Sequence, residues 1–120
     1  MANRDDLARA WIELQKMPRD SDGHRQLFWA HNKMWDLLRV DPNEYWLTIL
    51  EILHQDKSEW IIENLAAGPL EDLLVAHGPE FIGHIEAIAD EPGVRSLAQL
   101  VWKNEIPDDV WRRLQTVAGR

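Results

Sequence analysis

The chain has 120 residues, no cysteine and a net charge of −8. A domain of this length buries roughly two thirds of the surface of its unfolded chain, so folding requires neither disulfides nor a structural metal. The lack of cysteine excludes thiolate catalysis and cysteine-based zinc sites. A charged N-terminus, with no apolar run near the roughly 20 residues that span a bilayer, predicts a cytoplasmic protein without a membrane segment.

The spacing of the apolar residues is helical along almost the whole chain, because they recur at intervals of three and four. Leu7, Trp11 and Leu14 form such a stripe, and no segment alternates as a strand does. The pattern predicts one all-α domain over residues 1–120, built as a compact orthogonal array of short helices, with solenoid-like stacking as the alternative. We expect about seven or eight helices, near residues 4–16, 23–39, 42–55, 57–67, 69–77, 79–89, 93–103 and 107–118.

Helix starts carry recognisable capping residues. Asp41 precedes Pro42, and Glu44 follows three residues after the aspartate, which is typical of a capped first turn. Asp56 has the same spacing to Glu59 and predicts a second start of this kind. The segment from Pro18 to Gly23 reads as a loop, with Ser21 or Asp22 as the cap of the next helix.

Two Gly-Pro pairs, Gly68-Pro69 and Gly78-Pro79, lie ten residues apart. A glycine can end a helix with a positive φ, and a proline fits the first position of the next helix. We therefore expect a corner at each pair, with a short helix between them. The nearby acidic residues then lie in first turns, where the helix dipole stabilises them.

Seven tryptophans stand against two phenylalanines and one tyrosine. Trp29 lies about 200° from Leu27 on a helical wheel, beside Lys33 and Asp36, so it is our candidate for an exposed aromatic anchor. Core packing is the expected role of five others that fall on or beside apolar stripes, namely Trp11, Trp35, Trp46, Trp60 and Trp111.

Motifs for catalysis or metal binding are sparse. A Glu-x-x-His pair, Glu51 and His54, occurs once, whereas a di-iron bundle needs two such pairs and two further glutamates on long helices. No serine lies in a Gly-x-Ser-x-Gly elbow, and no glycine-rich phosphate loop is present. We assign no catalytic residue, no metal ligand and no cofactor, and we expect a protein that is not an enzyme.

Charge is concentrated in the middle of the chain. Residues 41–91 hold twelve acids and only one basic residue, Lys57, a net charge of −11, against +1 for residues 1–40 and +2 for residues 92–120. Such a chain offers no positive groove for nucleic acid. The acidic segment either serves solubility and helix capping or faces a basic partner.

The stretch ENLAAGPLEDLLVAHG, from Glu63 to Gly78, and the stretch IPDDVW, from Ile106 to Trp111, resemble a known family. It is a family of small all-helical bacterial proteins classed only as a domain of unknown function. The similarity covers about residues 58–115. The resemblance implies a bacterial source and an all-α fold, and it adds no catalytic residue.

The sequence is compatible with three functional hypotheses. The leading hypothesis is a non-catalytic protein-binding module, like an immunity protein or an antitoxin, that presents an acidic face to a basic partner. The second is an enzyme or small-ligand protein with a polar cleft at the Gly-Pro corners, formed by Glu71, Asp72 and His77. The third is a structural homo-oligomer assembled through exposed Trp29 or Trp60. The residues expected to bind a partner are Glu59, Glu63, Glu71, Asp72, Glu80 and Trp29.

Overall fold

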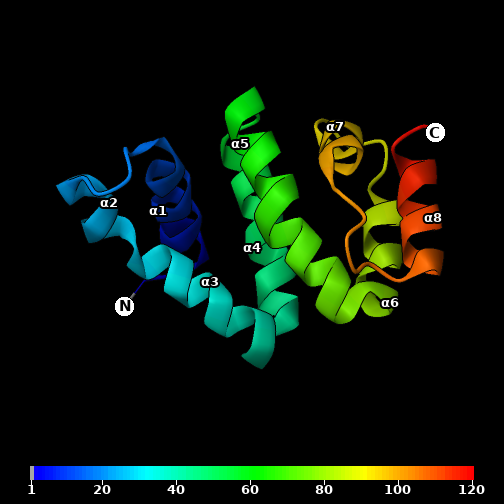
Figure 1. Cartoon of the computed structure of the whole chain (residues 1–120), viewed down its shortest axis with the longest axis horizontal. Coiled ribbons are helices and arrows are strands. Elements are labelled where there is room, and N and C mark those ends of the chain that lie inside the picture. The colour runs from blue at the N-terminus through cyan, green and yellow to red at the C-terminus, as the bar shows by residue number, and fades with distance from the viewer. Residues whose placement is uncertain (1) are drawn as a thin grey trace. The chain divides into compact units, whose positions relative to one another are not determined.

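The computed structural model describes residues 2–120, and the regular structure of these residues is entirely helical. The all-α prediction is therefore confirmed. Figure 1 labels the helices along the chain. The elements are α1 (Arg4–Lys16), α2 (Asp22–Leu27), α3 (Trp29–Val40), α4 (Pro42–Gln55), α5 (Glu59–Leu65), the π-helical turn η1 (Ala66–Leu70), α6 (Glu71–Ala87), α7 (Val94–Leu100) and α8 (Asp108–Val117).

Several of these elements join without a corner. Phe28, between α2 and α3, keeps a right-handed helical backbone at φ −62° and ψ −19°. The chain also continues from α5 through η1 into α6, because Leu70 stays helical at φ −70° and ψ −43°. Residues 2–120 thus form six separate helical runs, so the expected number of seven or eight was wrong. The orthogonal array and the solenoid-like stacking stay predictions.

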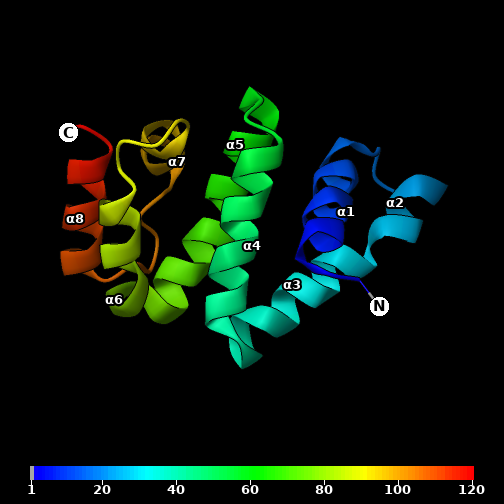
Figure 2. The same ribbon diagram turned by 180° about the vertical axis from the view of Figure 1, so that it is seen from behind.

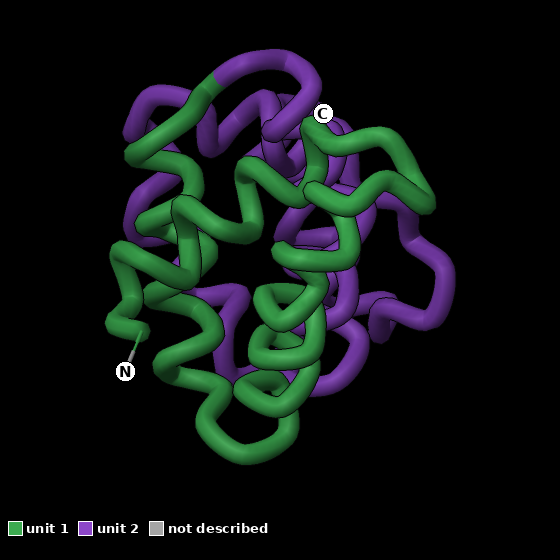
Figure 3. Tube along the Cα trace, turned by 90° about the vertical axis from the view of Figure 1, so that its left-hand side faces the viewer, with its two compact units in different colours: residues 1–57 green, residues 58–120 purple. Residues whose placement is uncertain are grey.

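The chain divides into two compact units, residues 1–57 and residues 58–120, which Figure 3 distinguishes by colour. The first unit contains α1 to α4 and the second contains α5 to α8. Each unit has its own buried apolar residues. The expectation of one domain over the whole chain stays a prediction.

In the first unit, α1 packs against both α3 and α4. The stripe predicted on α1 is buried, with Leu7, Trp11 and Leu14 at most 5% exposed. Two ion pairs also connect α1 to the α4 segment. Arg4 binds Glu44 through two hydrogen bonds of 2.7 and 2.8 Å, and Lys16 Nζ lies 3.0 Å from Asp56 Oδ2.

Capping in this unit follows the sequence pattern with one exception. Asp41 Oδ1 accepts a hydrogen bond from the backbone N–H of Glu44 at 3.1 Å, and Ser21 Oγ accepts one from His24 at 3.1 Å. Both residues are therefore N-caps, as predicted. Asp56 instead pairs with Lys16, and α5 begins after Ser58, so the predicted start at Asp56 was wrong.

In the second unit, α6 packs against α8, while α7 packs against α5, η1 and α8. Figure 2 shows α7 and α8 beside the end of α6. Arg113 on α8 forms a two-point hydrogen-bonded ion pair with Glu86 on α6, in which Nε lies 2.9 Å from Oε2. The α7 helix ends at Leu100, three residues earlier than expected, and the chain is extended at Val101.

The expected corner was wrong at the first Gly-Pro pair, whereas the second pair adjoins a kink at which α6 divides into two helical parts. The glycines with positive φ among residues 2–120 are Gly93 and Gly119, so neither glycine of a Gly-Pro pair ends a helix in that way. Gly68 and Pro69 lie inside η1, and Gly78 and Pro79 lie inside α6. The physical reason is that a π-helical turn and a kink relieve the clash that a proline ring makes with the preceding helical turn.

The two glycines differ in their surroundings. The kink in α6 lies at His77, whose φ of −139° and ψ of 27° are not helical. Next to it, Gly78 is buried, and a Cβ atom added there would lie 3.1 Å from both γ-carbons of Val110 on α8. A Cβ atom added at Gly68 would meet no atom within 4 Å. Only the second glycine is therefore needed for close helix packing.

Candidate functional site

The candidate surface begins with α5, the first helix of the second unit. Its buried residues are Ile61, Ile62 and Leu65. Glu59 and Glu63 lie on its exposed side, four residues apart, which places the two carboxylates one above the other on the helix surface. No hydrogen bond or ion pair involves either carboxylate among residues 2–120. Because like charges at this spacing repel, the pair costs stability by a few tenths of a kcal/mol.

Large apolar side chains are exposed at the same place. In the described part of the second unit, these are Trp60 on α5, Leu100 at the end of α7 and Trp102 just after it. Trp60 is 55% exposed and Trp102 is 73% exposed. Because α5 and α7 pack against one another, the three side chains belong to neighbouring elements.

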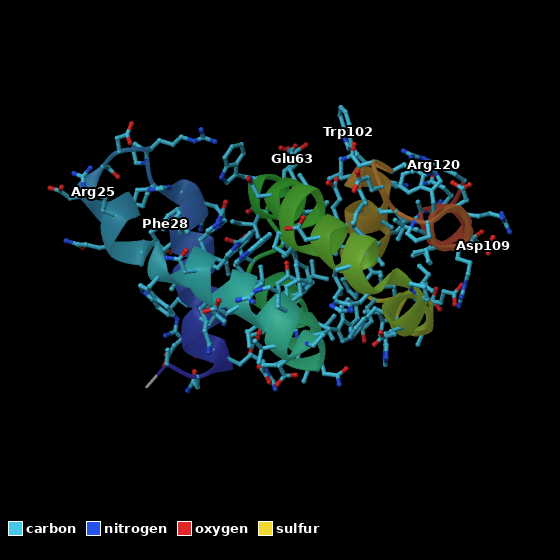
Figure 4. All side chains as sticks on the ribbon, turned by 60° about the horizontal axis from the view of Figure 1, so that its bottom comes forward. Arg25, Phe28, Glu63, Trp102, Asp109 and Arg120 are labelled. Atoms are coloured by element: carbon cyan, nitrogen blue, oxygen red, sulfur yellow. The ribbon has the colours of Figure 1, made fainter. Side chains whose placement is uncertain are left out.

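Figure 4 shows Glu63 and Trp102 extending to the same side of the second unit. We name this region the acidic–aromatic surface and define it by Glu59, Trp60, Glu63, Leu100 and Trp102. Tryptophans with exposed indoles are the side chains that contribute most to binding energy in protein interfaces. The surface therefore combines unneutralised negative charge with apolar anchors.

The whole helical run from α5 to α6 is acidic. Residues 59–87 contain six Asp or Glu and no Lys or Arg, and the second unit as a whole holds eleven acids against five basic residues. Of the six, Glu86 is neutralised by Arg113, whose hydrogen bonds lower the pKa of that carboxyl against a smaller opposing effect of burial. The negative potential is therefore weakest at the α8 side of this run and is not neutralised at α5.

The other acids predicted to bind a partner are more dispersed. Glu71 is half-buried and accepts a hydrogen bond of 3.0 Å from Asn104 Nδ2, in the loop that also carries Trp102. Asp72 is half-buried, and Glu80 is exposed beyond the kink, 3.9 Å from His77 Nδ1. Glu71 therefore adjoins the acidic–aromatic surface through its loop, whereas Glu80 belongs to another part of the run.

The predicted polar cleft of Glu71, Asp72 and His77 stays a prediction. The carboxylate of Glu71 accepts a hydrogen bond from Asn104. His77 lies six residues after Glu71, which corresponds to about 9 Å along the axis of an α-helix. No group of three or more histidine or acidic side chains among residues 2–120 is arranged to hold a metal ion.

Two of the five tryptophans expected in the core are exposed instead. Trp35 and Trp60 are each 55% exposed, so that expectation was wrong for both. Each directly adjoins a buried residue, Met34 or Ile61, and one residue turns an α-helix by about 100°. Trp35 and Trp60 therefore lie beside the buried stripe of their helix and not on it. Trp11 and Trp46 are buried as predicted, and Trp111 is half-buried.

In the first unit, Trp29 is 40% exposed and lines a cavity of about 530 Å³. We call this the Trp29 cavity. It lies among the first turns of α1 and α4 and one side of α3, and its other lining residues include Arg4, Leu7, Lys33, Leu37 and Glu44. The exposure of Trp29 was predicted from its place on the helical wheel, but the cavity was not.

A second cavity, of about 460 Å³, lies in the second unit beside the Glu86–Arg113 pair. Arg95 also lines it, and its guanidinium is so close to Gly119 that a Cβ atom there would lie 2.1 Å from Nη2. Gly119 has a φ of 83° at the end of α8, where a cation interacts favourably with the last carbonyl groups. Gln99 Nε2 donates a hydrogen bond of 2.9 Å to the carbonyl of Ala118 at this end, and Arg95 adds a positive charge beside it.

A family model described as a family of unknown function, DUF6869, matches residues 17–120. The chain belongs to this family. The match includes the whole second unit and most of the first, so it extends beyond residues 58–115, where the resemblance is visible in the motifs. No curated protein and no solved structure matches the chain significantly. Among residues 2–120, no helix is long and apolar enough to cross a bilayer.

Proposed function

We propose that this DUF6869 chain is a non-catalytic protein-binding module, comparable in mode of action to immunity proteins and antitoxins. Its acidic–aromatic surface binds a basic protein partner. The observation that carries the proposal is the pair Glu59 and Glu63, which no Lys or Arg side chain neutralises and which flanks the exposed Trp60. A cationic partner would relieve the repulsion between these carboxylates.

The two kinds of side chain contribute differently to binding. The net charge of −6 of the second unit attracts a cationic protein before contact, which raises association rates by about 10-fold to 1,000-fold at low salt. The indoles of Trp60 and Trp102 supply apolar area that becomes buried in the complex. The partner therefore needs Lys or Arg side chains around an apolar pocket.

The test begins with capture of partners from a lysate of the source organism, followed by titration of each purified partner. Glu59→Gln together with Glu63→Gln removes two charges from the surface. The matched control, Asp90→Asn together with Glu91→Gln, removes two exposed charges that follow α6 in the same unit and lie outside the acidic–aromatic surface. We expect the first pair to slow association and to reduce the salt dependence, while the control keeps both properties.

A second comparison tests the aromatic anchor. Trp60→Ala should weaken binding by about 30-fold or more, the loss typical of an interface hot spot. Trp35→Ala is the control, because Trp35 has the same exposed fraction of 55% but lies in the first unit. Equal losses for both variants, or equal affinities for all the charge variants, would contradict the proposal.

The homo-oligomer reading predicts a different result in the same experiments. Sedimentation of the purified chain would then show self-association that Trp60→Ala abolishes. The ligand-binding hypothesis through Glu71, Asp72 and His77 stays an alternative proposal.

A further inference from the structure

The Trp29 cavity has the size and mixed lining of a small-molecule site. Its volume of about 530 Å³ falls within the range of roughly 300 to 1,000 Å³ that is usual for ligand pockets. Leu7 and Leu37 supply buried apolar surface, and the indole of Trp29 supplies an aromatic wall that is partly exposed. A planar ring can stack on an indole face with an energy beyond that of the buried area alone.

The charges around the cavity do not cancel. Arg4 and Glu44 form a two-point ion pair in which the hydrogen bonds from Arg4 lower the pKa of the Glu44 carboxyl, although burial opposes this. These two charges therefore satisfy each other at the cavity wall. Lys33 is exposed, and none of the ion pairs found among residues 2–120 includes it. Its ammonium group leaves a net charge of +1 among the lining side chains.

Two helix starts also border the cavity. Arg4 is the first residue of α1 and Glu44 is in the first turn of α4, so the cavity adjoins the N-terminal ends of both helices. These helices have 13 and 14 residues, and the N-terminal end of a helix carries a partial positive charge. Asp5 and Asp6 in α1, and Asp41 and Glu44 at α4, already interact with these positive ends. The charge of Lys33 is therefore what favours an anion in the cavity.

We propose that the Trp29 cavity binds a small organic anion that carries a planar ring, with the ring on Trp29 and the anionic group at Lys33. The Arg4–Glu44 pair forms a fixed wall and does not supply the binding charge. This site lies in the first unit and is independent of the acidic–aromatic surface of the second unit.

Three probes separate the parts of this proposal. Phenylacetate has the ring and the charge, phenylacetamide has the ring without the charge, and acetate has the charge without the ring. Binding is followed through the indole N–H resonance of Trp29 by NMR, assigned with Trp29→Phe. We expect a saturable shift with phenylacetate, binding at least about tenfold weaker with phenylacetamide, and no saturable shift with acetate.

Variants then locate the charge and the ring, with phenylacetate observed by saturation-transfer NMR. Lys33→Gln should weaken binding by about tenfold, since it removes a charge-assisted hydrogen bond. Lys57→Gln removes an exposed lysine of the same unit that does not line the cavity, and it should change the affinity by less than about twofold. Trp29→Ala should abolish binding, whereas Trp35→Ala should not.

Several results would overturn the proposal. These are the absence of saturable binding of phenylacetate, equal affinity for phenylacetate and phenylacetamide, or equal weakening by Lys33→Gln and Lys57→Gln. Because Lys33 is exposed, its substitution leaves the fold intact, which the circular dichroism spectrum verifies. The lysine comparison thus remains decisive if Trp29→Ala fails to fold.

Discussion

The two glycines of the Gly-Pro pairs should respond oppositely to the same substitution. Alanine favours helix over glycine by about 1 kcal/mol, and it also lowers the conformational entropy of the unfolded chain. Both glycines lie in helical runs without a positive φ, so both substitutions gain this term. The new methyl group has open space at Gly68, and we expect Gly68→Ala to raise the free energy of unfolding by about 0.5 to 1 kcal/mol.

At Gly78 the methyl group meets Val110. Both γ-carbons of that valine would lie 3.1 Å from it, and rotation of the valine offers little relief because its χ1 angle is restricted in a helix. Overpacking of a well-packed core costs about 1 to 3 kcal/mol. The cost exceeds the gain from alanine, so Gly78→Ala should lower the free energy of unfolding by about 1 kcal/mol.

Urea unfolding followed by far-UV circular dichroism measures both effects. The double variant Gly78→Ala, Val110→Ala provides the control, because it removes the two methyl groups that clash. We expect Gly78→Ala to destabilise the Val110→Ala background less than the wild-type chain, or to stabilise it. If Gly68→Ala and Gly78→Ala changed stability equally, close packing at Val110 would not distinguish the two glycines, and the reasoning would be refuted.

Two further predictions concern the core and the surface charges. Thermal and urea unfolding should show that Trp11→Ala costs about 3 to 5 kcal/mol, since Trp11 is 4% exposed, whereas Trp35→Ala changes stability by less than about 0.5 kcal/mol. Glu86, whose pKa is lowered by the Arg113 hydrogen bonds, adds stability that is fully present above the ordinary pKa of 4.5 and is lost as the pH falls through its lowered value. The free energy of unfolding should therefore depend less on pH in this acid range in Glu86→Gln and in Arg113→Gln than in the wild-type chain. If its pH dependence were unchanged in both variants, the Glu86–Arg113 pair would not be the source of that dependence.

The sequence by itself determined the helix class and several helix boundaries. The bounds of α1 and α4 were predicted to the residue, because apolar spacing and capping act over one or two helical turns. Asp41 and Ser21 each cap a helix by accepting a hydrogen bond from the residue three positions later, so their role can be predicted from the local sequence alone. The acidic middle of the chain and the family motif are also properties of the sequence alone.

Tertiary structure decided what these elements present to their surroundings. The two Gly-Pro pairs carry the same local signal, yet η1 keeps the chain helical through the first pair, whereas the second pair lies at the kink in α6. Trp35 and Trp60 lie within about 100° of buried positions, so only the placement of neighbouring helices distinguishes surface from core. The Trp29 cavity joins residues from α1, α3 and α4 that are up to 40 positions apart, and contacts at that separation are set by packing rather than by local propensity.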